Sequence, residues 1–351
     1  MYLSKLIEIC ETFHIFALYY QLTQTMKFIN SDQIRTGINK AASEGTPFFF
    51  VIDYEMSEGL LIENPMAQSE ILFHFNGIGN IPSQTKDVQK SKLTISPIPI
   101  KEYQSKFKIV QQGLKSGEVD VINLTIKTPI STNIDAKEIF LLSQSPYRIY
   151  VPGKFVCFSP ERFVKIENGK ISSNPMKGTI DASVPNADQV MLNDPKEIAE
   201  HTATTKLIVE ELTCIARNVR IKRFRYIDRI ELSSRTLLQV SSEVEGELPN
   251  NYMTRIGDII FSLLPAGSIT GSPKTKAKEY IKLSEDESIG YYCGIAGYFD
   301  GEMLDSAVLI RLIETDQEGK LHFRSGGGIT SHSICEKEYQ EVLDKIYLPF
   351  A

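Results

Sequence analysis

The chain has 351 residues, of which 42% are hydrophobic, and a formal net charge of −6. This length is enough for one large hydrophobic core or for two joined ones. Such an acidic chain offers no electrostatic footprint for nucleic acid or for an anionic membrane, and we expect neither partner.

The cysteines are five in number and form no C-x-x-C pair. This pattern is typical of reduced thiols in a cytoplasmic protein, and it argues against a disulfide framework or a zinc site. The five are Cys10, Cys157, Cys214, Cys293 and Cys335.

Residues 1–25 fit poorly with the sequence that follows. Their longest apolar run, from Ile15 to Tyr20, is too short to span a bilayer, and no small-residue cleavage pattern marks a signal peptide. Two hypotheses stay open: an amphipathic N-terminal helix, or an extension that is not native, with Met26 as the true start. The intact mass of the native protein tests the second hypothesis.

The rest of the chain alternates between strand and helix patterns. Apolar or alternating runs predict strands, at residues 47–52, 71–75, 119–126, 147–158 and 235–246. Helical spacing and start and stop signals predict helices, at residues 103–114, 194–217 and 273–281 and after Ser333. Prolines and serines at 80–100 predict a loop and an edge strand, and a second hairpin spans residues 292–311.

Lys177 stands in the run Asn-Pro-Met-Lys-Gly-Thr at residues 174–179. Proline fixes φ and glycine tolerates conformations closed to other residues, so this frame suits a lysine that must point one way. A solvated lysine on a surface turn is the alternative for an isolated motif of this kind. Asn168 and Gly169, a favoured hairpin pair, lie between Glu161 and Lys177, so we predict that these two side chains are near each other.

Two pairs of glutamates, each spaced three residues apart, lie on two of the predicted helices. Such residues share a helix face, although an acid in a first turn also complements the helix dipole. Ser333 and Glu336 supply a capping signal for the last helix, so its pair is not needed for capping. Two acid pairs on separate helices would suit Mg²⁺, which prefers hard oxygen ligands. The pairs are Glu197 with Glu200 and Glu338 with Glu341.

Four blocks in this order make the chain resemble the chorismate-utilising enzymes, which include the anthranilate, aminodeoxychorismate, isochorismate and salicylate synthases. The blocks occupy residues 159–163, 174–179, 265–274 and 326–329, and the resemblance runs from about Tyr103 to the C-terminus. It implies an α+β fold of two antiparallel β-sheets packed as a sandwich with helices on the outside. It also implies one chorismate-binding domain over residues 26–351, with two subdomains.

Lys177 makes the chain most similar to aminodeoxychorismate synthase component I within this family. Anthranilate synthases typically carry alanine at this place, whereas the best-known aminodeoxychorismate synthases carry lysine. The resemblance implies that Lys177 is a covalent nucleophile and that Glu161 is the general acid and base. The implied product is 4-amino-4-deoxychorismate, the precursor of p-aminobenzoate for folate synthesis.

The resemblance also implies a Mg²⁺ site and a set of substrate contacts. Glu200 and Glu341 would be direct ligands, and Glu197 and Glu338 would hold bound waters. The implied substrate contacts are Thr179, Gln239, Tyr292, Arg311, Gly326, Gly328 and Lys345. Gln239 replaces a family histidine and can donate a hydrogen bond without protonating a leaving group. For Arg311 and Lys345 the alternative role is an ion pair. For the glycine run, residues 326–328, the alternative is a flexible turn.

No glutaminase is visible in the sequence, so ammonia is expected from solution or from a separate glutamine amidotransferase subunit. Three alternatives stay open: anthranilate synthase component I, an isochorismate or salicylate synthase, and a non-catalytic chorismate-binding subunit. Members that add water carry a lysine base where our alignment places Val121, which argues against isochorismate formation.

Overall fold

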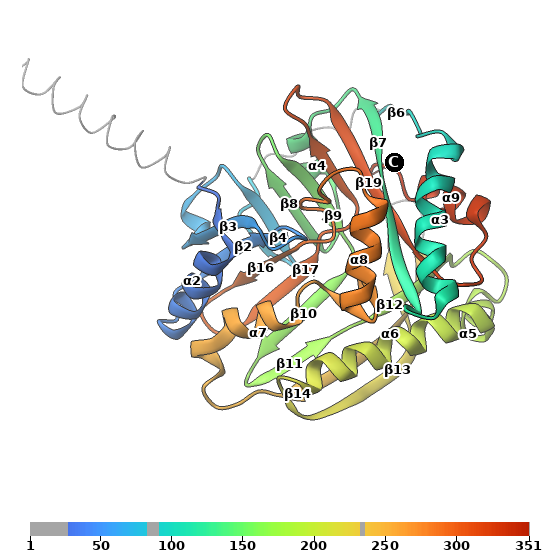
Figure 1. The fold of residues 1–351 in the computed structure, drawn as a ribbon. Coiled ribbons are helices and arrows are strands. Elements are labelled where there is room, and N and C mark those ends of the chain that lie inside the picture. The colour runs from blue at the N-terminus through green and yellow to red at the C-terminus, as the bar shows by residue number, and fades with distance from the viewer. Residues whose placement is uncertain (1–26, 83–90, 232–235, 351) are drawn as a thin grey trace, which may run out of the picture.

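The computed structural model describes residues 27–82, 91–231 and 236–350. The two hypotheses for residues 1–25 lie outside these ranges. Within them, the strands form two antiparallel sheets, one of ten strands and one of nine, with helices on the outside (Figure 1). This is the α+β architecture that the family resemblance implies.

The ten-stranded sheet carries Lys177 at one end. Its order is β1-β3-β2-β16-β17-β10-β11-β14-β12, and β13 pairs with β14 beside this path. Its strands are β1 (Ile29–Asn30), β2 (Phe48–Ile52), β3 (Glu58–Glu63), β10 (Arg162–Glu167), β11 (Lys170–Ser173), β12 (Met176–Asp181), β13 (Arg217–Glu231), β14 (Thr236–Glu247), β16 (Ile295–Phe299) and β17 (Leu304–Val308).

The nine-stranded sheet carries the glycine run. Its order is β15-β7-β19-β18-β9-β8-β4-β5, and β6 pairs with β7 as a short edge strand. Its strands are β4 (Leu72–Phe75), β5 (Ile78–Gly79), β6 (Leu93–Ile95), β7 (Val121–Thr132), β8 (Tyr147–Val151), β9 (Phe155–Ser159), β15 (Gly271–Ser272), β18 (Leu312–Thr315) and β19 (Leu321–Ile329).

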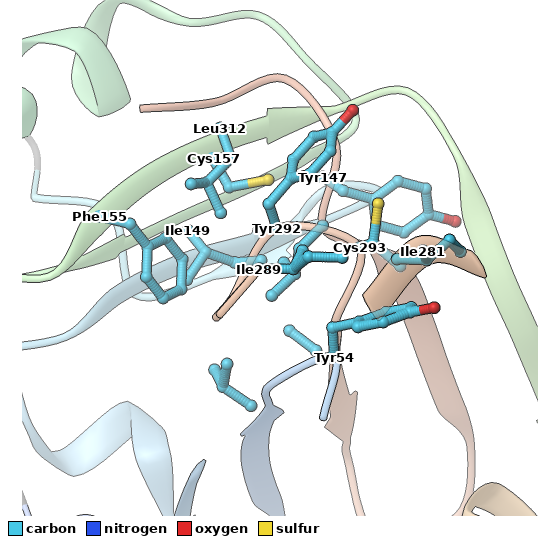
Figure 2. Packing of buried hydrophobic residues seen from close by; sticks show 14 of the residues in the cluster. Tyr54, Tyr147, Ile149, Phe155, Cys157, Ile281, Ile289, Tyr292, Cys293 and Leu312 are labelled. Atoms are coloured by element: carbon cyan, nitrogen blue, oxygen red, sulfur yellow. The ribbon is translucent and has the colours of Figure 1, made fainter. Parts of the chain in front are cut away.

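The two sheets face each other across a shared apolar core (Figure 2). Phe49 of β2 and Phe73 of β4 stack there with ring centroids 4.9 Å apart. Phe49 and Val51 of β2 and Phe73 and Phe75 of β4 belong to this core, whereas the residues that alternate with them in β2 pack on the outer face of their sheet. The two sheets therefore pack face to face because this removes the apolar side chains of both sheets from water.

Helices cover the remaining faces. Apolar residues of α2, α6 and α7 pack on the outer face of the ten-stranded sheet, and those of α4 pack on the nine-stranded sheet. The helices are α2 (Ser31–Ser43), α3 (Ile100–Ser116), α4 (Ala136–Leu142), α5 (Ala187–Asn193), α6 (Pro195–Thr213), α7 (Ile256–Leu263), α8 (Lys274–Ser284) and α9 (Cys335–Asp344), with short 3-10 turns η1 (Pro65–Ala67), η2 (Tyr252–Arg255) and η3 (Gly267–Ile269). In the described part of the chain, none is long and apolar enough to span a membrane.

Several local predictions are confirmed. Helix α3 ends at Gly117, which adopts a left-handed φ of 77°. Asn168 and Gly169, at φ 52° and 73°, connect β10 to β11 as the predicted hairpin turn. Asp194 accepts the backbone N–H of Glu197 at 3.1 Å, so the predicted start of α6 is also correct.

Three predictions are wrong in detail. Residues 147–158 form two strands, β8 and β9, because Pro152 and Gly153 turn the chain between them. Helix α6 ends at Thr213, and the following residues form β13, which pairs along most of its length with β14. Ser333 does not cap α9: its Oγ accepts the N–H of Thr330, and the helix begins at Cys335.

Candidate active site

Lys177 lies on β12 at a β-bulge. It stands opposite Val240 of β14, whereas Thr179 stands opposite Gln239, so Gly178 between them is the extra residue. Gly178 adopts φ +71°, and a Cβ at this position would lie 2.9 Å from Oε2 of Glu197 on α6. Glycine is therefore required here both by its backbone conformation and by the close approach of a carboxylate.

Glu161 lies between β9 and β10 and is buried. Its carboxyl accepts a 2.8 Å hydrogen bond from Oγ of Ser268, and its backbone N–H donates to Oγ of Ser159 at 3.1 Å. Burial raises the pKa of this carboxyl, although Lys177, Ser268 and then Arg311 act in the opposite direction. Glu161 and Lys177 therefore interact, which confirms that the hairpin brings them near each other.

Arg311 lies where the chain crosses from one sheet to the other. We expected it at the end of an apolar strand, but β17 ends at Val308, and Arg311 adopts a left-handed φ of 56° just before β18. Its Nε is buried and has no hydrogen-bond partner among the described residues. A buried guanidinium nitrogen without a partner is costly, and this one fits an anionic ligand.

Lys345 follows α9 and contributes a second cation. Its Nζ donates to the carbonyl oxygen of Gly326 and to Oε1 of Glu341, both at 2.8 Å. Burial lowers the pKa of Lys345, and Arg311 and Lys177 lower it further against the opposing effect of Glu341. Lys345 thus interacts electrostatically with two other cations, Arg311 and Lys177, and both of these also interact with the Glu161 carboxyl.

The glycine run is part of strand β19, so the flexible-turn alternative is wrong. Its residues stand opposite Thr125, Leu124 and Asn123 of β7. On its other edge β19 pairs with β18 only through Leu321–Arg324, so no strand of the described ranges covers that edge at Gly326–Gly328. Backbone N–H groups in an antiparallel strand alternate between its two edges, and some of them are therefore directed to this edge.

The four predicted acids stand on two helices. Glu197 lies against Gly178, whereas Oε1 of Glu341 and Oε2 of Glu338 lie 3.7 and 3.8 Å from the Cβ position of Gly327. In the described ranges, no group of three or more His, Cys, Asp or Glu side chains is placed to hold a metal ion. Mg²⁺ commonly takes one or two protein carboxylates and completes its shell with water and substrate oxygens, so these donors fit Mg²⁺ in kind.

The remaining predicted contacts differ in their surroundings. Nε2 of half-buried Gln239 lies 3.5 Å from Oγ1 of exposed Thr179, which is a long hydrogen bond. Tyr292 is only 3% exposed and belongs to the core between the sheets (Figure 2). It interacts electrostatically with Arg311, and burial raises the pKa of its hydroxyl.

The block at residues 265–274 is packed against its neighbours. A Cβ at Gly267 would overlap the Glu211 carboxylate of α6, and a Cβ at Gly271 would overlap the carbonyl oxygen of Val121. Lys274 forms a 2.6 Å ion pair with Glu211 and donates to the carbonyl of Leu263. These residues therefore hold the loop that presents Ser268 to Glu161.

Sequence reasoning missed His201, which directly follows Glu200 on α6. The imidazole is 1% exposed, and its Nε2 lies 2.6 Å from Oγ of Ser242 on β14. Burial, then Arg225 and Lys177, lowers the pKa of His201 to about 4. The available signal was its spacing of four residues from Glu197, which places both side chains on one face of α6.

Comparison with known proteins identifies the family. The model of the chorismate binding enzyme family matches residues 21–350. A Haemophilus influenzae protein named as an uncharacterized PabA-like protein is 44% identical over 313 residues, covering 89% of this chain and 94% of that protein.

More distant relatives have named activities. Aminodeoxychorismate synthase component 1 of Salmonella typhimurium is 31% identical over 261 residues, covering 70% of this chain and 56% of that protein. Anthranilate synthase component 1 of Archaeoglobus fulgidus is 32% identical over 253 residues, covering 68% of this chain and 60% of that protein. Overall identity therefore does not separate these two activities.

A solved structure confirms the architecture. The structure of MenF, the menaquinone-specific isochorismate synthase of Escherichia coli, superposes with a TM-score of 0.71 at 15% identity, covering 92% of this chain and 82% of that one. At this identity the likeness concerns the fold alone. The family match and the 44% identical relative establish more: the chain belongs to the chorismate-binding enzyme family.

Proposed function

We propose that this chain is an aminodeoxychorismate synthase component I, which converts chorismate and ammonia to 4-amino-4-deoxychorismate and water. One observation carries the proposal: Lys177, on the bulge of β12, interacts with the buried carboxyl of Glu161. A nucleophilic amine beside a proton donor is the pair that a covalent substitution at a ring hydroxyl requires.

The cations around this pair would hold the substrate. Chorismate carries two carboxylates, and an arginine fork is well shaped to bind one of them. The buried Nε of Arg311 and the edge of β19 at the glycine run support this role. Lys345, already bonded to the carbonyl of Gly326, would contact the second carboxylate or the same one.

The chemistry then proceeds in two substitutions. Glu161 protonates the C4 hydroxyl, which leaves as water while the Lys177 amine bonds to the ring. Ammonia next adds at C4 and displaces the lysine, which regains its free amine. The Glu161 carboxylate takes one proton from the new ammonium group, which leaves the neutral amine and restores the acid. Covalent catalysis divides one difficult displacement into two easier ones. Lys177 must be neutral to attack, because only an uncharged amine has the free electron pair that forms the bond.

Glutamates of α6 and α9 would hold Mg²⁺, with Glu200 and Glu341 as direct ligands and Glu197 and Glu338 holding bound water. When bound, the ion would draw electron density from the ring carboxylate and ease departure of the hydroxyl. The convergence of Glu338 and Glu341 over Gly327 supports this assignment. Glu341 is ion-paired with Lys345, so this lysine and the ion would share one carboxylate.

Specific residues weigh against the rival activities. Lys177 stands where anthranilate synthases typically carry alanine. Val121, at the position we align with the water-activating lysine, directs its Cγ2 toward Gly328, 3.4 Å from the Cβ position there. An apolar side chain at the glycine run cannot activate water for isochorismate formation. A non-catalytic subunit would have no need to keep the four glutamates.

The ammonia would come from solution or from a separate glutamine amidotransferase subunit in the cytoplasm. The product would pass to a different enzyme for conversion to p-aminobenzoate and folate. Both statements follow from the proposed reaction and share its test.

Purified protein incubated with chorismate, Mg²⁺ and ammonium, with products identified by mass, tests the proposal. We expect 4-amino-4-deoxychorismate that requires both ammonium and Mg²⁺. Fluorescent anthranilate as the main product would assign the chain to the anthranilate synthases, and isochorismate would contradict the interpretation of Val121. Absence of any Mg²⁺-dependent turnover would favour the non-catalytic subunit.

A further inference from the structure

We propose that His201 is a positioning residue for Lys177. Its imidazole fastens α6 to Ser242 of β14, and Ser242 in turn holds the segment that leads into the Lys177 bulge. The inference deepens the proposed function and rests on the role given there to Lys177.

Ser242 is a junction between four segments. Its backbone N–H donates to the carbonyl of Pro175 at 3.0 Å, and its Oγ accepts the backbone N–H of Arg225 at 3.0 Å. The same Oγ lies 2.6 Å from Nε2 of His201. One fully buried serine thus joins β14, β13, helix α6 and the residue two places before Lys177.

The pairing of β12 with β14 links Ser242 to the amine of Lys177. Val240, opposite Lys177, is two residues from Ser242 on β14. On the other side of the bulge, Glu197 of the same helix approaches Gly178. Because Glu197 and His201 are four residues apart, one face of α6 touches the structure before and after Lys177. A shift of α6 along β14 would therefore move the amine.

Packing alone does not explain an imidazole here. His201 is buried, with the exposed ring of Phe224 lying edge-on 6.0 Å away and with Arg225 and Lys177 as its charged neighbours. Its Nδ1 is buried and has no hydrogen-bond partner in the described ranges. Leucine would fill such a site without that cost, so the bond to Ser242 is the feature that the histidine adds.

Four variants separate this role from general stability. His201→Leu and Ser242→Ala each remove the bond, whereas His201→Gln can restore it through the side-chain amide. Thr205→Val is the matched control, because Thr205 is buried one turn further along α6. Among the residues that the structure describes, its hydroxyl bonds only to the carbonyl oxygen of His201 on the same helix. Steady-state turnover with chorismate, Mg²⁺ and ammonium gives kcat and KM for each variant, and thermal unfolding gives Tm.

We expect His201→Leu and Ser242→Ala each to lower kcat about tenfold, as for loss of one buried hydrogen bond, with little change in KM for chorismate. The double variant should be no worse than Ser242→Ala, which also loses the bond from the N–H of Arg225. His201→Gln should recover most of kcat, and Thr205→Val should match the wild type. Additive losses, or lowered Tm with unchanged kcat, would overturn the proposal. If His201→Leu does not fold, Ser242→Ala, which lacks only one hydroxyl, carries the test.

A second measurement tests the positioning role without any assay of activity. If the wild type shows no turnover, the proposed function is wrong, but this measurement still tests whether His201 positions Lys177. Amide hydrogen exchange at residues 176–179 reports directly on the bulge. Lost protection in His201→Leu and Ser242→Ala, with protection kept in His201→Gln and Thr205→Val, would support positioning. Unchanged protection in both bond-deleting variants would overturn it.

Discussion

Oγ of Ser268 donates a 2.8 Å hydrogen bond to the carboxyl of Glu161, across 107 residues of sequence. The bond joins two blocks that the sequence marked separately. It fixes a carboxyl that burial has withdrawn from water, and burial also raises its pKa. A carboxylic acid that keeps its proton longer than usual is suited to protonate a leaving hydroxyl.

Glu161→Gln should abolish turnover yet stabilise the fold near neutral pH. As pH rises through the ordinary glutamate value of 4.5, the unfolded chain ionises first, because the folded pKa is raised. Wild-type stability attributable to this group therefore falls until pH passes the folded pKa, and the variant lacks that fall. Urea unfolding at about pH 4 and about pH 7 measures the difference.

The control is Glu70→Gln, at an exposed surface position. It should show no pH-dependent gain and no loss of turnover. A Glu161→Gln variant that is less stable than the wild type at neutral pH would contradict the picture of a buried acid held above its usual pKa.

Arg311→Lys should raise KM for chorismate at least tenfold while leaving the fold intact. Lysine keeps the positive charge but loses the planar fork that binds a carboxylate with two parallel hydrogen bonds. Steady-state kinetics measures KM, and Arg255→Lys, an exposed ion-pairing arginine, is the control. Unchanged KM would remove Arg311 from the substrate site and leave its buried Nε without an explanation.

Gly178→Ala should cost both stability and turnover. A left-handed φ costs a non-glycine residue about 1–2 kcal/mol, and here the new Cβ would also press on the Glu197 carboxylate. Gly153→Ala is a matched control, since Gly153 has φ +67° but no heavy atom within 4 Å of its Cβ position. Denaturant unfolding and turnover separate the two effects.

Both variants should lose a similar amount of backbone stability, and only Gly178→Ala should lose activity. Equal activity in the two variants would mean that the contact between the bulge and α6 does not matter for the reaction.

Glu341→Gln should weaken the response to Mg²⁺ at least tenfold, because even the loss of an outer-shell partner weakens metal binding by about tenfold or more. The variant keeps the shape of the side chain but removes the charge that both Lys345 and the ion would use. Titration of activity with Mg²⁺, and calorimetric titration of the protein with Mg²⁺, measure the effect. Glu336→Gln, exposed in the first turn of α9, should behave as the wild type; an identical Mg²⁺ response in both variants would argue against this ligand assignment.

The sequence predicted best what depends on local signals. The pair Asn168 and Gly169 predicted a tight hairpin, and this hairpin returns the chain so that Glu161 lies near Lys177. Gly117 likewise marked the end of α3. Such positions are predictable because left-handed conformations restrict the choice of residue.

Other features depend on partners far along the chain. Arg311 looked like a strand end because its apolar neighbours continue past β17, but the chain must change sheets there. His201 shows its function only through Ser242, 41 residues away. Tertiary contacts override the local pattern at both of these positions. At Ser333 the competing contact is itself local, because its hydroxyl accepts the N–H of Thr330, three residues away, and does not cap α9.

The most direct test is the intact mass of the protein after brief mixing with chorismate and Mg²⁺ without ammonia. We predict an adduct equal to chorismate less one water, located on Lys177 by peptide mapping. Adding ammonia should discharge it as 4-amino-4-deoxychorismate. Lys177→Ala should form neither the adduct nor this product, whereas Lys170→Ala, at the exposed first position of β11, should form both. Formation of 4-amino-4-deoxychorismate by Lys177→Ala at the wild-type rate would contradict the central claim.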